Sequence, residues 1–266
     1  MEDNKNGRKE SDLVAKVPQV TLLFWIIKIL ATTLGETGGD AVTMSWLGET
    51  TSEAKGTGYL IGTAIFGVIF VTAVIVQIKA KEFHPFLYWL TIVATTTVGT
   101  TLADYCTRSL GVGYTGGSTI LLTLVIASLV IWRWSTGSIS IDTVNTPKVE
   151  IFYWVTIMFS QTLGTALGDW VADTNEMGYV GAGAVFSGLL LLTALLYYFT
   201  SISRVTLFWA AFILTGPLGA VVGDFLDKPI AKEGLALSRY AASFALLAVI
   251  IVLILIFPQK PASKAH

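Results

Sequence analysis

Four aspartates recur at a fixed distance from a tryptophan, each inside an otherwise apolar segment. Every one lies fifteen residues after the Trp of an aromatic–Trp pair, with a Gly five positions before it and a Gly or Ala immediately before it. Such a spacing, kept four times, defines an internal repeat. A carboxylate in a membrane span is costly unless something uses or neutralises it. The repeated aspartates are therefore the first indication of function: Asp40, Asp104, Asp169 and Asp224.

The charges four residues away from these aspartates differ between the repeats. Repeats two and four supply a base, Arg108 or Lys228, which predicts an ion pair on the same helix face. Repeats one and three instead supply a second acid, because Glu36 precedes Asp40 and Asp173 follows Asp169 by four residues. Like charges at that spacing repel, so a bound cation or protons are expected to offset them.

This difference predicts a metal site built from repeats one and three. We expect Glu36, Asp40 and Asp169 as ligands, with Asp173 as an outer recruiting carboxylate. Asp104 and Asp224 are then ion-paired supports or secondary ligands. The alternative is structural, with each acid at the outer interface capping a turn or paired to a base.

Hydroxyl groups surround these acids, and three threonines, Thr33, Thr100 and Thr165, are candidate secondary ligands. Oxygen ligands without imidazole or thiolate favour hard cations such as Mg²⁺ and Mn²⁺. Lys28 lies twelve residues before Asp40, inside the first apolar segment. It either extends its ammonium to the interface or acts as a counter-ion that changes partner during transport.

The composition sets the frame for these residues. A mean hydropathy of +0.69, with 53% apolar and 13% charged residues, is typical of an integral membrane protein. Eight apolar segments are long enough to cross a bilayer. The formal charge of −1 says nothing about a nucleic-acid partner, and no basic tract suggests one. The single Cys106 excludes an intrachain disulfide. We expect an all-α protein with the lipid bilayer around it.

Two apolar segments per repeat predict four helical hairpins between short tails. The predicted ranges are tail 1–17, repeats 18–82, 83–146, 147–200 and 201–258, and tail 259–266. Because each hairpin returns to its starting side, the motif helices should be parallel and form the core, with the second helices outside them. The Gly–x–x–x–Gly pattern predicts close helix packing.

Lysine and arginine predict the orientation. The tails and the loops between hairpins carry eleven of them, and the loops within hairpins carry five. This bias places both termini in the cytoplasm. The Trp residues are then predicted as anchors at the cytoplasmic interface, and the aspartates lie about 22 Å farther along each helix.

The motif runs resemble those of a family of bacterial multi-pass inner-membrane proteins, often labelled membrane-anchored proteins. The resemblance is carried by Thr33-Leu-Gly-Glu-Thr-Gly-Gly-Asp40 and its three counterparts ending at Asp104, Asp169 and Asp224. It implies a bacterial inner-membrane location and no particular substrate. Repeat four departs most, with Pro217 and Ala220 where the other repeats have Thr or Glu.

These features favour a divalent-cation transporter, with Mn²⁺ or Mg²⁺ as the substrate class and no resident cofactor. A channel is an alternative, since rings of acids select cations. A non-transporting scaffold or sensor, with the repeats used for packing, is another. An enzyme is disfavoured because the chain shows no nucleophile–base constellation or phosphate-binding loop. Import versus export and the oligomeric state stay open.

Overall fold

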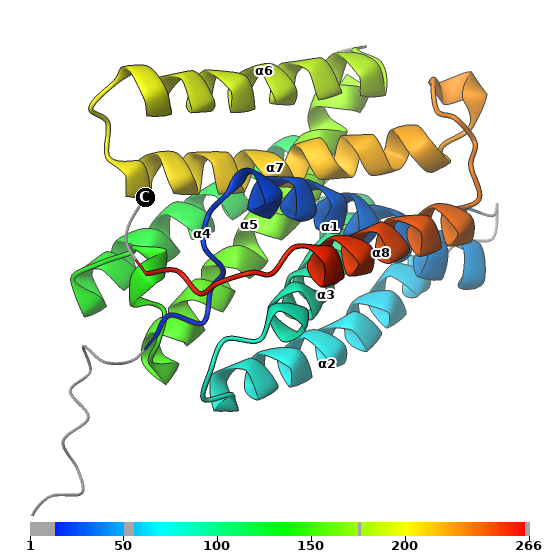
Figure 1. Ribbon diagram of the computed structural model, residues 1–266. Coiled ribbons are helices and arrows are strands. Elements are labelled where there is room, and N and C mark those ends of the chain that lie inside the picture. Colours follow the sequence, from blue (N-terminus) through cyan, green and yellow to red (C-terminus); the bar gives the residue numbers. More distant parts are fainter. Residues whose placement is uncertain (1–13, 51–55, 175–176, 264–266) are drawn as a thin grey trace, which may run out of the picture.

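The computed structural model describes residues 14–50, 56–174 and 177–263, and these form an all-helical bundle without strands (Figure 1). Parts of both predicted tails, residues 1–13 and 264–266, lie outside this description. The described ranges contain eight α-helices: α1 (Leu22–Asp40), α2 (Thr57–Lys79), α3 (Pro85–Asp104), α4 (Gly113–Thr136), α5 (Pro147–Thr174), α6 (Gly178–Phe199), α7 (Arg204–Asp227) and α8 (Arg239–Ile256). Short π-helical turns, Ala41–Trp46 and Tyr105–Ser109, extend α1 and α3.

Seven of these helices are long and apolar enough to cross a membrane. The eighth, α5, is the longest and carries Lys148, Glu150, Asp169 and Asp173 along its length. It begins at Pro147, whose missing N–H suits the first helical position. Helix α5 packs between α3 and α7 and so belongs to the core of the bundle. The predicted fold class, an all-α membrane protein of four repeats, is confirmed.

The four motif helices α1, α3, α5 and α7 form a closed ring in which each contacts two others. Each second helix packs mainly on the motif helix of the following repeat: α2 on α3, α4 on α5, α6 on α7, and α8 back on α1. Figure 1 shows two of these pairs, with α6 above α7 and α2 below α3. Whereas α1, α3 and α7 bury 61–72% of their most apolar stretch, the outer helices bury 17–28%. The outer surfaces thus remain available to lipid.

The motif glycines mark the closest contacts of the ring, as predicted. A Cβ added at Gly164 would lie 2.7 Å from backbone atoms of Gly216, and one at Gly99 would lie 3.0 Å from the Gln161 side chain. At the equivalent glycines of the other two repeats, Gly35 and Gly219, an added Cβ would contact a threonine side chain of the next repeat around the ring. Only glycine permits this approach at every joint. The four contacts are Gly35 with Thr96, Gly99 with Gln161, Gly164 with Gly216, and Gly219 with Thr32.

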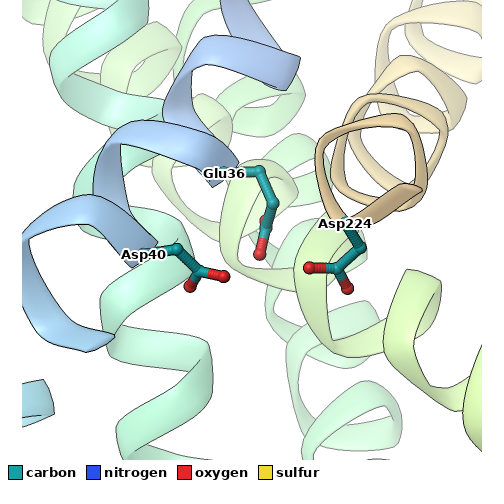
Figure 2. Close-up of side chains that lie close together, drawn as sticks. All are labelled: Glu36, Asp40 and Asp224. Carbon is teal, nitrogen blue, oxygen red and sulfur yellow. The ribbon is translucent and has the colours of Figure 1, made fainter. Parts of the chain in front are cut away.

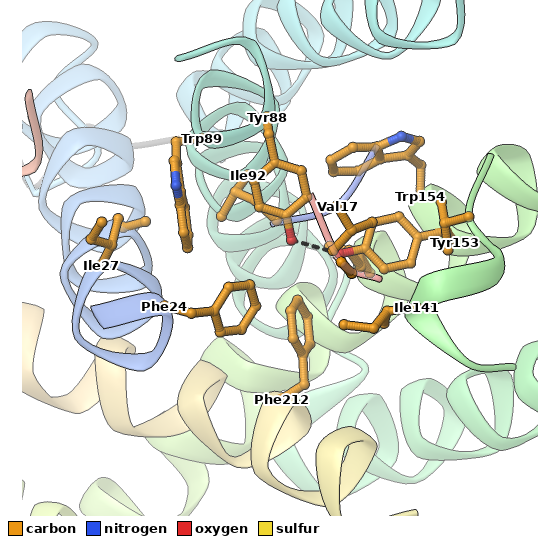
Figure 3. Packing of buried hydrophobic residues seen from close by; sticks show 14 of the residues in the cluster. Val17, Phe24, Ile27, Tyr88, Trp89, Ile92, Ile141, Tyr153, Trp154 and Phe212 are labelled. Carbon is orange, nitrogen blue, oxygen red and sulfur yellow. Dashed lines mark hydrogen bonds between the residues drawn. The ribbon is translucent and has the colours of Figure 1, made fainter. Parts of the chain in front are cut away.

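The aromatic–Trp pairs meet at the amino-terminal end of the ring. Each first aromatic ring packs on the Trp of the next repeat, with centroid separations of 5.4–6.2 Å: Phe24 with Trp89, Tyr88 with Trp154, Tyr153 with Trp209, and Phe208 with Trp25. Figure 3 shows the first two of these pairs. The Tyr88 and Tyr153 hydroxyls share a 2.6 Å hydrogen bond.

Assigning the tryptophans as interfacial anchors is therefore wrong for Trp89, Trp154 and Trp209. These three are at most 3% exposed, because the four helices converge at this level and bury one another's aromatic side chains. Trp25 is partly buried in the same layer. We call the residues Phe24, Tyr88, Tyr153, Phe208 and Phe212 with their partner tryptophans the aromatic layer.

Both terminal segments close the same end of the bundle. Pro18 and Pro261 form an antiparallel bridge, and the Ala262 N–H donates to the Val17 carbonyl. Lys16 Nζ lies 2.6 Å from Glu150 at the start of α5 and donates to the last carbonyls of α2. A chain that crosses a membrane an even number of times must have both of its ends on one side. The structure shows both terminal segments at the same end of the bundle.

Candidate cation site

The four repeated aspartates come together at the carboxy-terminal end of the ring. They occupy equivalent positions on α1, α3, α5 and α7, and each is at most 3% exposed: Asp40, Asp104, Asp169 and Asp224. Asp40 and Asp104 are the last α-helical residues before the π-helical turns. Such turns are frequent at functional sites because they redirect the following side chains.

Two bases bridge these aspartates in pairs. Arg108 Nε lies 3.0 Å from Asp104 Oδ1, and its Nη2 donates a 2.7 Å hydrogen bond to Asp169 Oδ2. Lys228 Nζ lies 2.9 Å from Asp224 Oδ1 and binds Asp40 Oδ2. The two predicted pairs within one helix are thus present. Each base also neutralises an aspartate of the next repeat, so repeats one and three do not lack a base as their sequences indicated.

Lys228 follows α7 directly and lies among three carboxylates. Burial alone would lower the pKa of its ammonium, but the carboxylates of Asp224, Asp40 and Asp227 raise that pKa well above its ordinary value. The ammonium also lies 3.6 Å from the Met44 sulfur.

Glu36 occupies the layer one helical turn before the aspartates. The equivalent positions in the other repeats are Thr100, Thr165 and Ala220. Both threonine hydroxyls donate to Glu36 Oε2, at 3.0 and 2.9 Å, and their oxygens lie 3.1 Å apart. Glu36 is 2% exposed. Its carboxyl is thus buried among the core helices and held by hydroxyls of repeats two and three.

Glu36, Asp40 and Asp224 form one compact acidic group. Each offers an oxygen within 4.8 Å of the other two, and the side chains point toward one another from α1 and α7 (Figure 2). Asp40 Oδ1 accepts no hydrogen bond from any residue that the structure describes. Across the described ranges, this is the one cluster of three or more Asp, Glu, His or Cys side chains with such spacing.

The whole region carries more acids than bases. Asp227 joins it through Arg239, whose Nε lies 3.0 Å from Asp227 Oδ2 and 3.9 Å from Asp40 Oδ2. Six buried carboxyl groups then face three bases, which leaves three negative charges if every group is ionised. Buried charges require compensation, so protons or a bound cation are expected here. The six acids are Glu36, Asp40, Asp104, Asp169, Asp224 and Asp227.

The structure separates the four predicted ligands. Glu36 and Asp40 belong to the acidic group, whereas Asp169 is bound by Arg108 and Asp173 is exposed, accepting a 3.1 Å hydrogen bond from the Tyr114 hydroxyl. Asp224, predicted as a support, takes the third position. The reason is the ring closure, which places the end of α7 beside α1.

Two other predicted residues have local roles. The Thr33 hydroxyl donates to the Ile29 carbonyl of its own helix. Lys28 is fully buried, with its Nζ 4.4 Å from the centroid of the Phe212 ring and without a hydrogen-bond partner in the described part of the chain. Among the described residues it forms no ion pair, and its ammonium stays inside the bundle.

A family model described as Repeat of Unknown Function (DUF347) matches the chain four times, over residues 23–83, 87–138, 152–203 and 207–258. Each match begins at the aromatic–Trp motif and extends through one hairpin. Neither the curated proteins nor the solved structures include a match to this chain.

Proposed function

We propose that this chain, which belongs to the Repeat of Unknown Function (DUF347) family, carries a divalent metal cation across a membrane. The observation that supports this best is the acidic group of Glu36, Asp40 and Asp224, buried between two core helices of a membrane bundle. Buried carboxylates in a span mark ion pathways because an unused charge there is costly.

Charge favours a divalent ion. Among the described residues on the α1–α7 side, two bases, Lys228 and Arg239, face four acids: Glu36, Asp40, Asp224 and Asp227. Four acids against two bases leave two negative charges, which one divalent cation or two protons would neutralise. Because one divalent cation and two protons neutralise the same charge, one could replace the other at the site. Such an exchange would couple cation movement to proton movement.

Ligand chemistry favours a hard cation, and we propose Mg²⁺ or Mn²⁺. The acidic group offers only carboxylate oxygens, and the hydroxyls of Thr100 and Thr165 fix one oxygen of Glu36. Hard cations take such ligands, whereas Zn²⁺ and Cu⁺ favour imidazole or thiolate. In this arrangement Asp104, Arg108 and Asp169 serve as an ion-paired support, and the exposed Asp173 recruits cations.

A carrier fits better than an open channel. The aromatic layer fills the ring at the end opposite the acids, with Tyr88, Tyr153 and Phe212 fully buried. An ion cannot pass a dry, packed layer of this kind without rearrangement. The Lys and Arg bias favours an orientation with this layer toward the cytoplasm and the acids in the outer half of the membrane. The family resemblance implies that this membrane is a bacterial inner membrane.

Binding can be tested on the purified protein in detergent. Mn²⁺ should raise the melting temperature progressively, with a stabilisation that grows with the logarithm of its concentration above Kd and reaches about 2.7 kcal/mol at one hundred times Kd. The Glu36→Gln, Asp40→Asn double variant should lose this shift and, in proteoliposomes, lose Mn²⁺ flux.

The matched control is Glu82→Gln, which removes an exposed acid between α2 and α3, at the end of the ring away from the acidic group, and should keep the thermal shift. A response to Zn²⁺ alone, or a double variant that responds like the wild type, would show that the acidic group is not a hard-cation site.

A further inference from the structure

Lys228 occupies the acidic group in the present structure. Its ammonium binds one oxygen of Asp40 and one of Asp224, two of the three carboxylates in the group. Lys228 as a residue is 8% exposed. A metal ion coordinated by the same carboxylates would sit about 2.1 Å from their oxygens. Both cations cannot hold this position together, because they would be in near contact at low dielectric.

The equivalent base on the other side of the ring differs in chemistry. Arg108 binds Asp104 and Asp169 through two separate nitrogens, Nε and Nη2. A planar guanidinium held at two points is fixed, while an ammonium on a four-carbon stem is a compact charge that can move. The layer beneath Arg108 also holds Thr100 and Thr165 in place of a second acid. Only the Lys228 side therefore combines surplus acid with a movable base.

A further carboxylate, that of Asp227, lies within reach of the Lys228 ammonium. Asp227 Oδ1 lies 3.9 Å from its Nζ. Since Lys228 is the residue directly after α7, its side chain can turn toward Asp227 without unwinding the helix. The ammonium would then leave Asp40 and Asp224 and stay near a carboxylate.

We propose that Lys228 determines specificity for divalent over monovalent cations, by occupying the cation position itself as a tethered ammonium. A monovalent ion that displaces it brings no additional charge and competes against a group held at high effective concentration. A divalent ion brings one more positive charge to a site with surplus acid. The difference in affinity between divalent and monovalent cations is then set by competition with the Lys228 ammonium, and not by the carboxylates alone.

This role rests on the cation-binding function proposed above, and one experiment separates the two. The Mn²⁺ dissociation constant is measured in detergent for the wild type and for Lys228→Met, each in 100 mM choline chloride or about 100 mM sodium chloride. Choline keeps the ionic strength while being too large for the site. Lys148→Met, which removes an exposed lysine far from the acids, is the control for lost charge.

Wild type and Lys148→Met should bind Mn²⁺ equally in both salts. Lys228→Met should bind at least about tenfold more tightly in choline, since its competitor is gone, and should lose that gain in sodium. Unchanged affinity without a sodium effect would overturn the role of Lys228 while leaving the cation site in place. Absence of divalent binding by the wild type would overturn the proposed function as well.

A second variant covers the case in which Lys228→Met does not fold. Lys228→Arg keeps the charge but binds its carboxylates through a planar fork. It should still exclude sodium and should bind Mn²⁺ several-fold more weakly than the wild type. Equal Mn²⁺ affinity, or sodium sensitivity, in this variant would also refute a tethered competitor.

Discussion

Gly164 provides the sharpest test of the closed ring. A methyl group in place of its hydrogen would lie 2.7 Å from the Cα and carbonyl carbon of Gly216, and 3.1 Å from the Pro217 nitrogen. These are backbone atoms, so no side-chain rotation can relieve the contact. Carbon atoms pack best at about 3.5–4.0 Å, and α5 and α7 would have to separate by roughly 1 Å.

The expected cost of Gly164→Ala follows from two opposing terms. Overpacking of this size costs about 1–3 kcal/mol, and the better helix propensity of Ala offsets at most about 1 kcal/mol. A net loss of roughly 1–2 kcal/mol would lower the melting temperature by roughly 2–8 °C in a chain of this length. The assay is thermal unfolding in detergent, followed by tryptophan fluorescence from the aromatic layer.

Gly188 supplies the matched control, because a Cβ added there meets no atom within 4 Å. Gly188→Ala should leave the melting temperature unchanged or slightly higher. Gly164→Ala should also reduce Mn²⁺ binding, since the neighbouring Thr165 donates to Glu36. If both variants melt with the wild type, α5 and α7 do not approach as described, and the ring contacts have another basis.

Two further predictions concern the charged residues that the cation does not bind. Arg108→Met should destabilise the protein by about 3–5 kcal/mol because it leaves two buried carboxylates without a base. Asp104→Asn should cost less stability, since Arg108 keeps its ion pair with Asp169. If thermal melts show a larger loss of stability for Asp104→Asn than for Arg108→Met, the shared pairing is contradicted. Lys28→Met should raise or preserve the melting temperature because it removes an unpartnered buried amine. If Lys28 is a counter-ion in the transport cycle, the same variant should lower Mn²⁺ flux in proteoliposomes while leaving Mn²⁺ affinity unchanged, and full flux would exclude that role.

The sequence predicted the repeat unit well because its chemistry is local. The spacing from Trp to Asp fixes one helix per repeat, and the small residues at Gly35 and Gly164 predict close helix contacts, which the structure shows. The ion pairs of Arg108 and Lys228 with the aspartates four residues before them follow from helix geometry alone.

Contacts between repeats could not be predicted in the same way. A periodic sequence does not state which neighbour each hairpin covers, so nothing indicated that α8 returns to α1 or that Lys228 reaches Asp40. The same gap explains the misread tryptophans. An amphipathic ring near a helix start is typical of an interface, but closure of the ring buries Trp89, Trp154 and Trp209 against one another's helices.

A ring of four identical repeats would place four equivalent aspartates around one axis, and nothing in it would favour a cation at one of the four positions over the others. The asymmetry comes from single substitutions at equivalent positions: Glu36 stands where the other repeats have Thr or Ala, and Lys228 stands opposite Arg108. The extra acid creates surplus charge on one side of the ring, and the weaker base makes that side exchangeable. Thr100 and Thr165 retain the hydroxyls that orient the acid. The repeats thus supply a rigid, close-packed support, and departures from the repeat supply the chemistry. Restoring the symmetry with Glu36→Thr should therefore remove cation binding while leaving the helical ring intact.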